Sequence, residues 1–154
     1  MYSGVQAEMV RMIYTKVEPD VCKKNRTFYK NHVRKAFIMW CAYEGYFDGV
    51  LSKPEIKKAK KGQLPKDLNI HHKMPLSGTY DSDFVNSFEN LVVIHKNTHE
   101  RINRDIFQPQ LNPMMKAPFG TQISIDVPAF GYVDEMGIRF ERAKALFRNK
   151  KRER

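Results

Sequence analysis

Two short apolar segments with a long polar stretch between them constrain the fold of this chain most. Residues 68–72 alternate in polarity as a short strand does, and residues 91–94 form a compact β-branched run that predicts a second strand. Residues 75–90 are rich in Gly, Ser, Asp and Asn, a composition that is typical of a loop. We therefore expect two strands joined by a long loop.

A helix should follow the second strand directly. Asn97 and Glu100 match a capping box, with Asn97 as the N-cap residue and Glu100 at the third helical position. We expect this helix to run to about Phe107, because Pro109 blocks its continuation. The centre of the chain is thus predicted to be strand, loop, strand and helix.

The flanking regions favour helix. We expect helices at 5–17, 27–44 and 134–150, a short helix capped by Ser52 with Pro54 in its first turn, and a strand at 123–127. Together these elements predict a mainly helical α+β fold, with residues 1–154 as a single domain. Its parts would be a helical, basic N-terminal region (1–66), the strand-loop-strand-helix core (68–107) and a C-terminal extension with a basic helix (108–154).

The charge of the chain favours a polyanionic partner. The formal net charge is +10, and the excess is concentrated in residues 23–66 and 139–154. Nucleic acid is the natural partner, since each phosphate that Lys or Arg neutralises releases counterions. A generally basic, soluble surface explains the same charge, and an anionic membrane surface is a weaker alternative. No apolar run approaches the roughly 18–20 residues that a membrane span needs.

Location and redox state are less constrained. Residues 1–8 lack the basic and apolar regions of a secretory signal, so we expect a cytoplasmic protein or one delivered by a non-classical route into a target cell. Cys22 and Cys41 have no metal-like spacing. Reduced thiols are expected, and a single disulfide stays open.

The histidines carry the chemistry. Four of the five lie between positions 71 and 99, and imidazole can both bind a transition metal and accept a proton from water near neutral pH. Neighbouring strand residues point in opposite directions, so one of His71 and His72 can face a metal while the other faces a reacting water. His99 would lie in the first turn of the predicted helix, with Asn103 on the same face one turn later.

These residues stand in the order of a known motif. The elements are His71-His72, Pro75, Asn90-Leu91 and His99. On a strand-loop-strand-helix frame, this order resembles the HNH or ββα-metal (His-Me finger) endonucleases. Its double-histidine form is similar to the DNase colicins, the pyocins and the nucleases of polymorphic toxins. The resemblance covers residues 68–107 and implies hydrolysis of DNA phosphodiester bonds with little sequence specificity.

The resemblance implies a role for each residue. His72, the second member of the pair, would be the general base, and His71 and His99 would be ligands of one divalent metal ion. Asn90 would brace the loop and keep the catalytic strand in shape without touching the metal. The third ligand of the family often lies four residues after the helix histidine. Here that position is Asn103, whose amide oxygen could bind directly or through water.

Other features of the family are partly missing. Many members hold a structural zinc with two CxxC pairs, but His95 and Thr98 stand where the second pair would be, so we expect no structural zinc. Lys73, Arg101 and Arg104 flank the site and are candidates for holding phosphates, although solvated charges would give the same pattern.

The natural cation cannot be chosen from the ligands alone. Imidazole suits Zn²⁺ or Ni²⁺, whereas phosphoryl transfer and cellular abundance favour Mg²⁺ or Mn²⁺. We expect Mg²⁺ or Mn²⁺ to support turnover and Zn²⁺ to bind more tightly. Activity should rise with pH through about 6–7, where an unperturbed imidazole loses its proton.

Several functions remain open at this point. The double-histidine form resembles antibacterial toxin and effector nucleases, which would imply a cognate acidic immunity protein as a partner. A phage or mobile-element nuclease would carry the same motif without an inhibitor. An RNA-cleaving enzyme, or a non-catalytic nucleic-acid-binding module stabilised by a metal, would also fit the residues.

Overall fold

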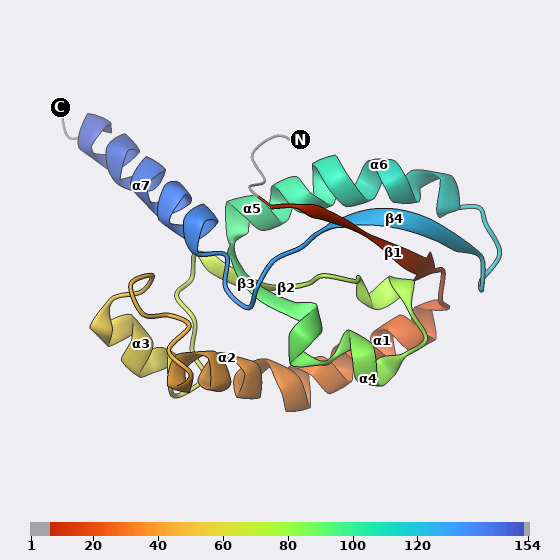
Figure 1. The fold of residues 1–154 in the computed structure, drawn as a ribbon, viewed down its shortest axis with the longest axis horizontal. Helices are drawn as coiled ribbons and strands as arrows, with labels where there is room; N and C mark the ends of the chain where they lie inside the picture. Colours follow the sequence, from red (N-terminus) through yellow and green to blue (C-terminus); the bar gives the residue numbers. More distant parts are fainter. Residues whose placement is uncertain (1–6, 153–154) are drawn as a thin grey trace.

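The computed structural model describes residues 7–152 and confirms a mainly helical α+β fold (Figure 1). The strands are β1 (Met9–Thr15), β2 (Leu68–His72), β3 (Leu91–His95) and β4 (Gln122–Pro128). The helices are α1 (Pro19–Phe28), α2 (Arg34–Tyr43), α3 (Lys53–Ala59), α4 (Ser82–Val85), α5 (Lys96–Arg101), α6 (Gln108–Leu111) and α7 (Glu135–Arg152). The π-helical segments Tyr29–Val33 and Ile102–Phe107 join α1 to α2 and α5 to α6. Short 3-10 turns lie at Leu76–Gly78, Phe88–Asn90 and Asn112–Met114.

Strand β3 is the centre of the molecule, and all of its residues are buried. Leu91 and Val93 belong to one hydrophobic cluster, together with Phe37 of α2. Val92 and Ile94 point the opposite way, into a second cluster. Each buried aliphatic side chain stabilises the fold by roughly 1.5–3 kcal/mol. Because both faces of β3 are buried, residues 91–94 form a continuous apolar run instead of alternating in polarity.

The predicted order of strand, loop, strand and helix is confirmed. β2 pairs with β3 in antiparallel register, with His71 opposite Val92 and His72 opposite Leu91. α5 begins at Lys96, directly after β3. This register places the two histidines at the end of β2 and brings the helix beside them.

The predicted start of this helix is wrong by two residues. His95, not Asn97, is the N-cap residue, and its Nδ1 accepts a hydrogen bond of 3.1 Å from the backbone N–H of Asn97. The Asn97 side chain instead donates to the Glu141 carboxylate at 3.1 Å. The capping box with Glu100 does not form, because α5 already begins at Lys96 and Asn97 lies inside its first turn, where the His95 ring accepts the Asn97 N–H.

The predicted end of the same helix is also wrong. The helical path continues beyond Phe107, through Pro109 to Leu111. Pro109 directly follows the π-helical segment Ile102–Phe107 and lies in the first turn of α6. A π-helical turn already departs from the ordinary hydrogen-bond spacing, so a residue without an N–H fits there at little cost.

The predicted helix at 5–17 is wrong, because its central part is the strand β1 (Met9–Thr15). β1 pairs with β4 along its whole length, with Met12 opposite Ile125. Val10 and Ile13 are apolar but exposed and point to opposite faces of β1, so the apolar positions do not alternate and their spacing looks helical. Residues 5 and 6 of the prediction lie outside the described residues. The predicted strand at 123–127 is confirmed within β4.

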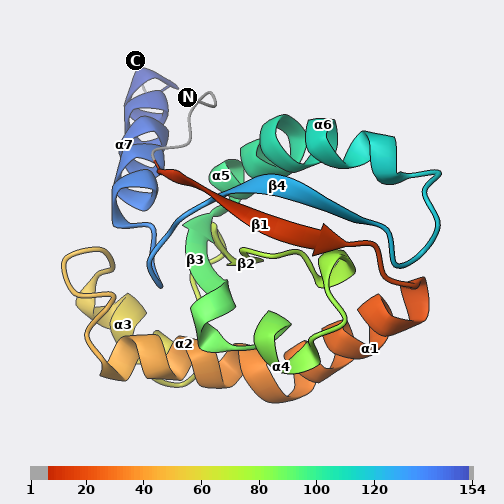
Figure 2. The same cartoon turned by 45° about the vertical axis from the view of Figure 1, so that its right-hand side comes forward.

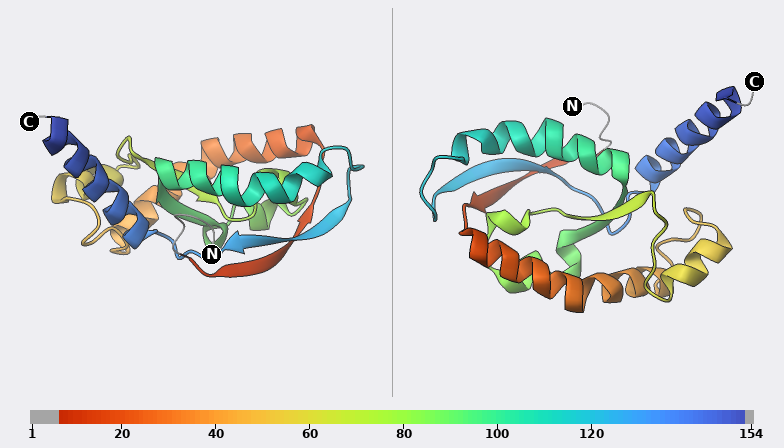
Figure 3. Two further views of the ribbon diagram at one scale, coloured as in Figure 1. Left: turned by 90° about the horizontal axis from the view of Figure 1, so that it is seen from above. Right: turned by 180° about the vertical axis from the view of Figure 1, so that it is seen from behind.

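The predicted helix at 27–44 belongs to a longer one. Its helical path begins at Pro19, which occupies the first turn of α1, and ends at Tyr43. Ser52 caps α3 as predicted, and it also forms a capping box with Glu55. In Figures 1 and 3, the helical path 19–43 and the helical path 96–111 run on opposite sides of β2. Figure 2 shows the β1–β4 pair crossing the molecule on the side of α6.

The predicted C-terminal helix is confirmed as α7, which projects from the body with its C-terminal end outward (Figure 3). None of the helices within residues 7–152 has the length and apolar character that crossing a lipid bilayer demands. Cys22 and Cys41 are both free thiols, and burial raises the pKa of the Cys41 thiol to about 12.

Burial of β3 can be tested by truncating one side chain. We expect Ile94→Ala to lower the free energy of unfolding by about 2–5 kcal/mol, because Ile94 is fully buried in the second cluster. Ile13→Ala removes the same atoms from a side chain that is 56% exposed, and should cost less than about 1 kcal/mol. Chemical denaturation measures both. Equal losses would contradict the central position of β3.

Candidate active site

One pocket of about 350 Å³ collects the histidines of the predicted motif. β2 supplies His71 and His72, while the helical path 96–111 supplies His99 and Asn103. The remaining wall comes from α1 and from the turn that follows β2. The structure therefore brings together four side chains that the sequence assigned to a common site.

His71 lies deepest in this group and is 3% exposed. Its ring stacks on Phe107 at 5.6 Å and meets the His99 ring edge-on at 5.4 Å between centroids. Burial, helped by the neighbouring His99, lowers the pKa of His71 to about 3. Its Nε2 is buried and has no hydrogen-bond partner within the described residues. An imidazole held neutral with an unused buried nitrogen is chemically ready to bind a cation.

The pair His71 and His99 has a spacing that suits one shared ion. Imidazoles bound to a tetrahedral cation, with metal–nitrogen distances of about 2 Å, have ring centres about 5 Å apart. Asn103 lines the same pocket and can add an amide oxygen. Within residues 7–152, no three side chains of His, Cys, Asp or Glu gather in a metal-binding group. Two imidazoles and an amide thus fit a cation that keeps open positions.

His72 alternates with His71 along β2, so its ring lies against Tyr29 while it still lines the pocket. Its ring meets Tyr29 edge-on at 4.5 Å, and its Nε2 is buried without a hydrogen-bond partner among the described residues. Burial lowers the pKa of His72 to about 4, with Asn86 raising it and the charge of Arg26 lowering it further. The imidazole is therefore a free base throughout the neutral range. The expected rise of activity through pH 6–7 should accordingly move to lower pH.

Asn90 holds the turn after β2 in place without lining the pocket. Its amide nitrogen donates to the carbonyl oxygens of Met74 at 3.0 Å and Val85 at 2.9 Å. Its amide oxygen accepts from the Met74 N–H at 2.8 Å. The side chain is 1% exposed, so all three bonds are shielded from water. This is the bracing geometry that the resemblance implies.

The three predicted phosphate-binding residues have other partners. Arg101 forms an ion pair with the buried Glu141. The ammonium group of Lys73 donates to the Glu89 carbonyl at 3.0 Å and lies over the Tyr132 ring. Arg104 pairs with Asp105, and its side chain remains 64% exposed on a hollow beside the main pocket. Of the three, Arg104 is best placed to reach a polyanion.

Arg26 and Cys22 line the pocket from α1 and were missed. They are four residues apart and so share one helix face, with Arg26 donating weakly to the Cys22 sulfur at 3.7 Å. The basic run at 23–35 was visible in the sequence, but the helix was expected to begin only at 27. Arg26 is the cation that the pocket offers to a bound anion.

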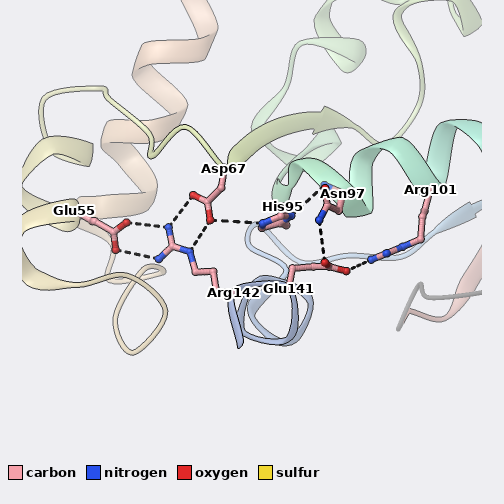
Figure 4. A network of polar contacts seen from close by, with 7 residues as sticks. All are labelled: Glu55, Asp67, His95, Asn97, Arg101, Glu141 and Arg142. Atoms are coloured by element: carbon pink, nitrogen blue, oxygen red, sulfur yellow. Dashed lines mark hydrogen bonds and ion pairs between the residues drawn. The ribbon is translucent and has the colours of Figure 1, made fainter. Parts of the chain in front are cut away.

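A polar network ties α7 to this core, as Figure 4 shows. Arg142 bridges the carboxylates of Glu55 and Asp67, and His95 lies 3.6 Å from Asp67. Burial lowers the pKa of His95, and Asp67 partly offsets that effect. Burial would raise the pKa of Glu141, but its bonds to Arg101 and Asn97 hold it below the ordinary value. His95 therefore has a structural position and caps α5.

Comparison with known proteins adds one relative. No protein-family model matches the chain, and no solved structure matches it. Over 96 residues, 62% of this chain, it is 29% identical to a protein of Escherichia coli strain K12 described as uncharacterized protein YhhZ. The chain spans about a quarter of that relative's length, since the match covers 23% of it. These comparisons assign no function to the chain, so a proposal has to rest on the residues that line the pocket.

Buried neutral histidines make stability depend on pH. His71 and His72 have an ordinary pKa of 6.5, which burial lowers to about 3 and about 4 in the fold. The unfolded chain binds more protons below pH 6.5, so the free energy of unfolding should fall on acidification from 6.5 toward 4. Each histidine contributes up to about 1.4 kcal/mol per pH unit.

Thermal unfolding at several pH values measures this slope. His71→Asn should flatten the loss of stability between pH 6.5 and 4. His32→Asn is the matched control, because His32 is exposed on the long N-terminal helix, and it should leave the slope unchanged. A slope that His71→Asn does not alter would contradict the buried, neutral state of His71.

Proposed function

We propose that this protein is a metal-dependent endonuclease that hydrolyses DNA phosphodiester bonds with little sequence specificity. The observation that carries the proposal is the convergence of His71, His72 and His99 in one pocket that also contains Arg26. Buried imidazole nitrogens without partners favour a catalytic role over a purely structural one. Such nitrogens lower the stability of the fold, and a bound ion or substrate would supply the missing partner.

The residues of the pocket divide the reaction between them. His72, neutral because its pKa is lowered to about 4, accepts the proton of the attacking water. Arg26 holds the phosphate through its charge and its planar set of donors. His71 and His99 hold the divalent cation, with Asn103 as the additional oxygen donor. A divalent cation held there would supply stabilisation of the negative charge on the phosphoryl oxygens and on the leaving 3′-oxygen.

The donor set supports an open, catalytic site. A structural zinc is enclosed by four protein ligands, whereas a catalytic site leaves positions for water and substrate. Two imidazoles and one amide leave such positions. Mg²⁺ or Mn²⁺ is the proposed cation for turnover, with Zn²⁺ or Ni²⁺ binding more tightly to the imidazoles. The competing function is a metal-stabilised module that binds nucleic acid without cleaving it.

The net charge of +10 supports a nucleic-acid substrate. DNA is proposed over RNA on the resemblance of the motif, and side-by-side digestion of the two separates them. An antibacterial effector, delivered into a target cell and neutralised by an acidic immunity protein, is the proposed biological role. A phage or mobile-element nuclease is the alternative, and a small acidic reading frame directly downstream of the gene would favour the toxin.

The base can be tested with plasmid DNA. Wild-type protein with Mg²⁺ or Mn²⁺ should nick and linearise the plasmid, and EDTA should stop it. His72→Ala should lower the rate by about 10²–10⁴ because the proton acceptor is lost. His32→Ala, at the exposed histidine of the same chain, should retain full activity. If the wild-type protein leaves DNA and RNA intact with every divalent metal, the nuclease proposal fails.

Arg26 can be tested through the salt dependence of cleavage. Arg26→Ala should lower kcat/KM by about 10–100-fold and reduce the slope of log kcat/KM against log salt by about 1, since one phosphate contact is lost. Lys30→Ala removes an exposed charge from the π-helical segment that follows α1, and should have a much smaller effect. A matching loss in the two variants would show that Arg26 contributes only to the general charge.

A further inference from the structure

Asn69 lies beside the ring of His99. Asn69 and His71 are two residues apart on β2, so both point to the same face of the strand. The amide nitrogen of Asn69 is 3.2 Å from Nδ1 of His99, and the His71 ring lies 5.4 Å from the same imidazole, measured between ring centroids. The Asn69 contact is partly buried. Asn69 has no direct role in the proposed hydrolysis.

This contact decides which nitrogen of His99 carries the proton. A neutral imidazole has one N–H and one free lone pair. If the Asn69 NH₂ group donates to Nδ1, the ring proton must be on Nε2, and no lone pair is left for a cation. If the amide is turned by 180°, its oxygen accepts from Nδ1–H and the Nε2 lone pair is free.

We propose that Asn69 is a positioning residue that presents its carbonyl oxygen to His99 and fixes the Nδ1–H tautomer. The inference rests on the proposed metal site and deepens it. Nε2 of His99 then binds the cation together with His71, whose own Nε2 is buried and unpartnered. Rotating the Asn69 amide by 180° places its oxygen where its nitrogen lies, 3.2 Å from Nδ1 of His99. This rotation needs no movement of the backbone. Asn69 itself does not bind the ion.

The test uses the full chain and two variants. Asn69→Asp keeps an oxygen acceptor, whereas Asn69→Leu keeps the volume and removes the acceptor. Zn²⁺ binding is measured by calorimetry, and the tautomer of His99 is read from its ¹⁵N chemical shifts. Gln122→Leu is the control for an exposed amide on a strand of the other sheet. Circular dichroism establishes that each variant is folded.

We expect wild-type protein with Zn²⁺ to show Nδ1–H and metal-bound Nε2 at His99. Asn69→Leu should bind Zn²⁺ about 10–100-fold more weakly, while Asn69→Asp and Gln122→Leu should bind at least as well as wild type. Undiminished Zn²⁺ binding by Asn69→Leu, or a proton on Nε2 of His99 in the loaded wild type, overturns the role of Asn69. Neither readout involves nucleic acid. If Asn69 controls Zn²⁺ binding but the wild type leaves DNA intact, the nuclease proposal fails alone.

Discussion

The arrangement of the site depends on the burial of β3 on both faces. Residues 91–94 are completely buried, and their alternate side chains anchor two hydrophobic clusters. One cluster includes residues of α2, α3 and α7, and the other includes residues of the β1–β4 pair. A shift of one residue in the pairing with β2 would turn each strand residue to the wrong face. The apolar burial thus fixes the register, and the register directs His71 and His72 to opposite faces of β2.

This rigid frame sustains an unfavourable group of polar atoms. The Nε2 atoms of His71 and His72 are both buried without partners among the described residues, and an orphaned buried polar group costs about 1–3 kcal/mol. Asn90, with three buried hydrogen bonds to Met74 and Val85, holds the backbone after β2 in place beside these histidines. The fold thus loses some stability at two neutral imidazoles that line the pocket.

The core of the fold could be predicted from sequence because its signals are local. The β-branched run at 91–94 and the polar loop before it define β3, and Ser52 with Glu55 defines the start of α3. The motif histidines were found because they lie close together in sequence. β1 was misread as a helix because its exposed positions also carry apolar residues, and only its partner β4, more than a hundred residues away, distinguishes the two.

Long-range pairing also explains which contacts near the site the sequence does not reveal. Arg101 is indistinguishable in sequence from a phosphate-binding residue, and its partner Glu141 becomes visible only when α7 folds back on α5. The Asn97 side chain donates to the same carboxylate and does not cap the helix, which begins one residue earlier. Arg26 was passed over because it comes from α1, far from the motif in sequence. Contacts of this kind depend on tertiary packing, which no local pattern records.

The central claim is that His71 and His99 share one cation. The most direct measurement is a crystal structure of the protein soaked with Zn²⁺ or Mn²⁺, with the ion located by anomalous scattering. We expect an ion about 2.0–2.2 Å from one nitrogen of each of these two rings. An ion bound to one ring alone, or held elsewhere on the molecule while the rings remain apart, would contradict it.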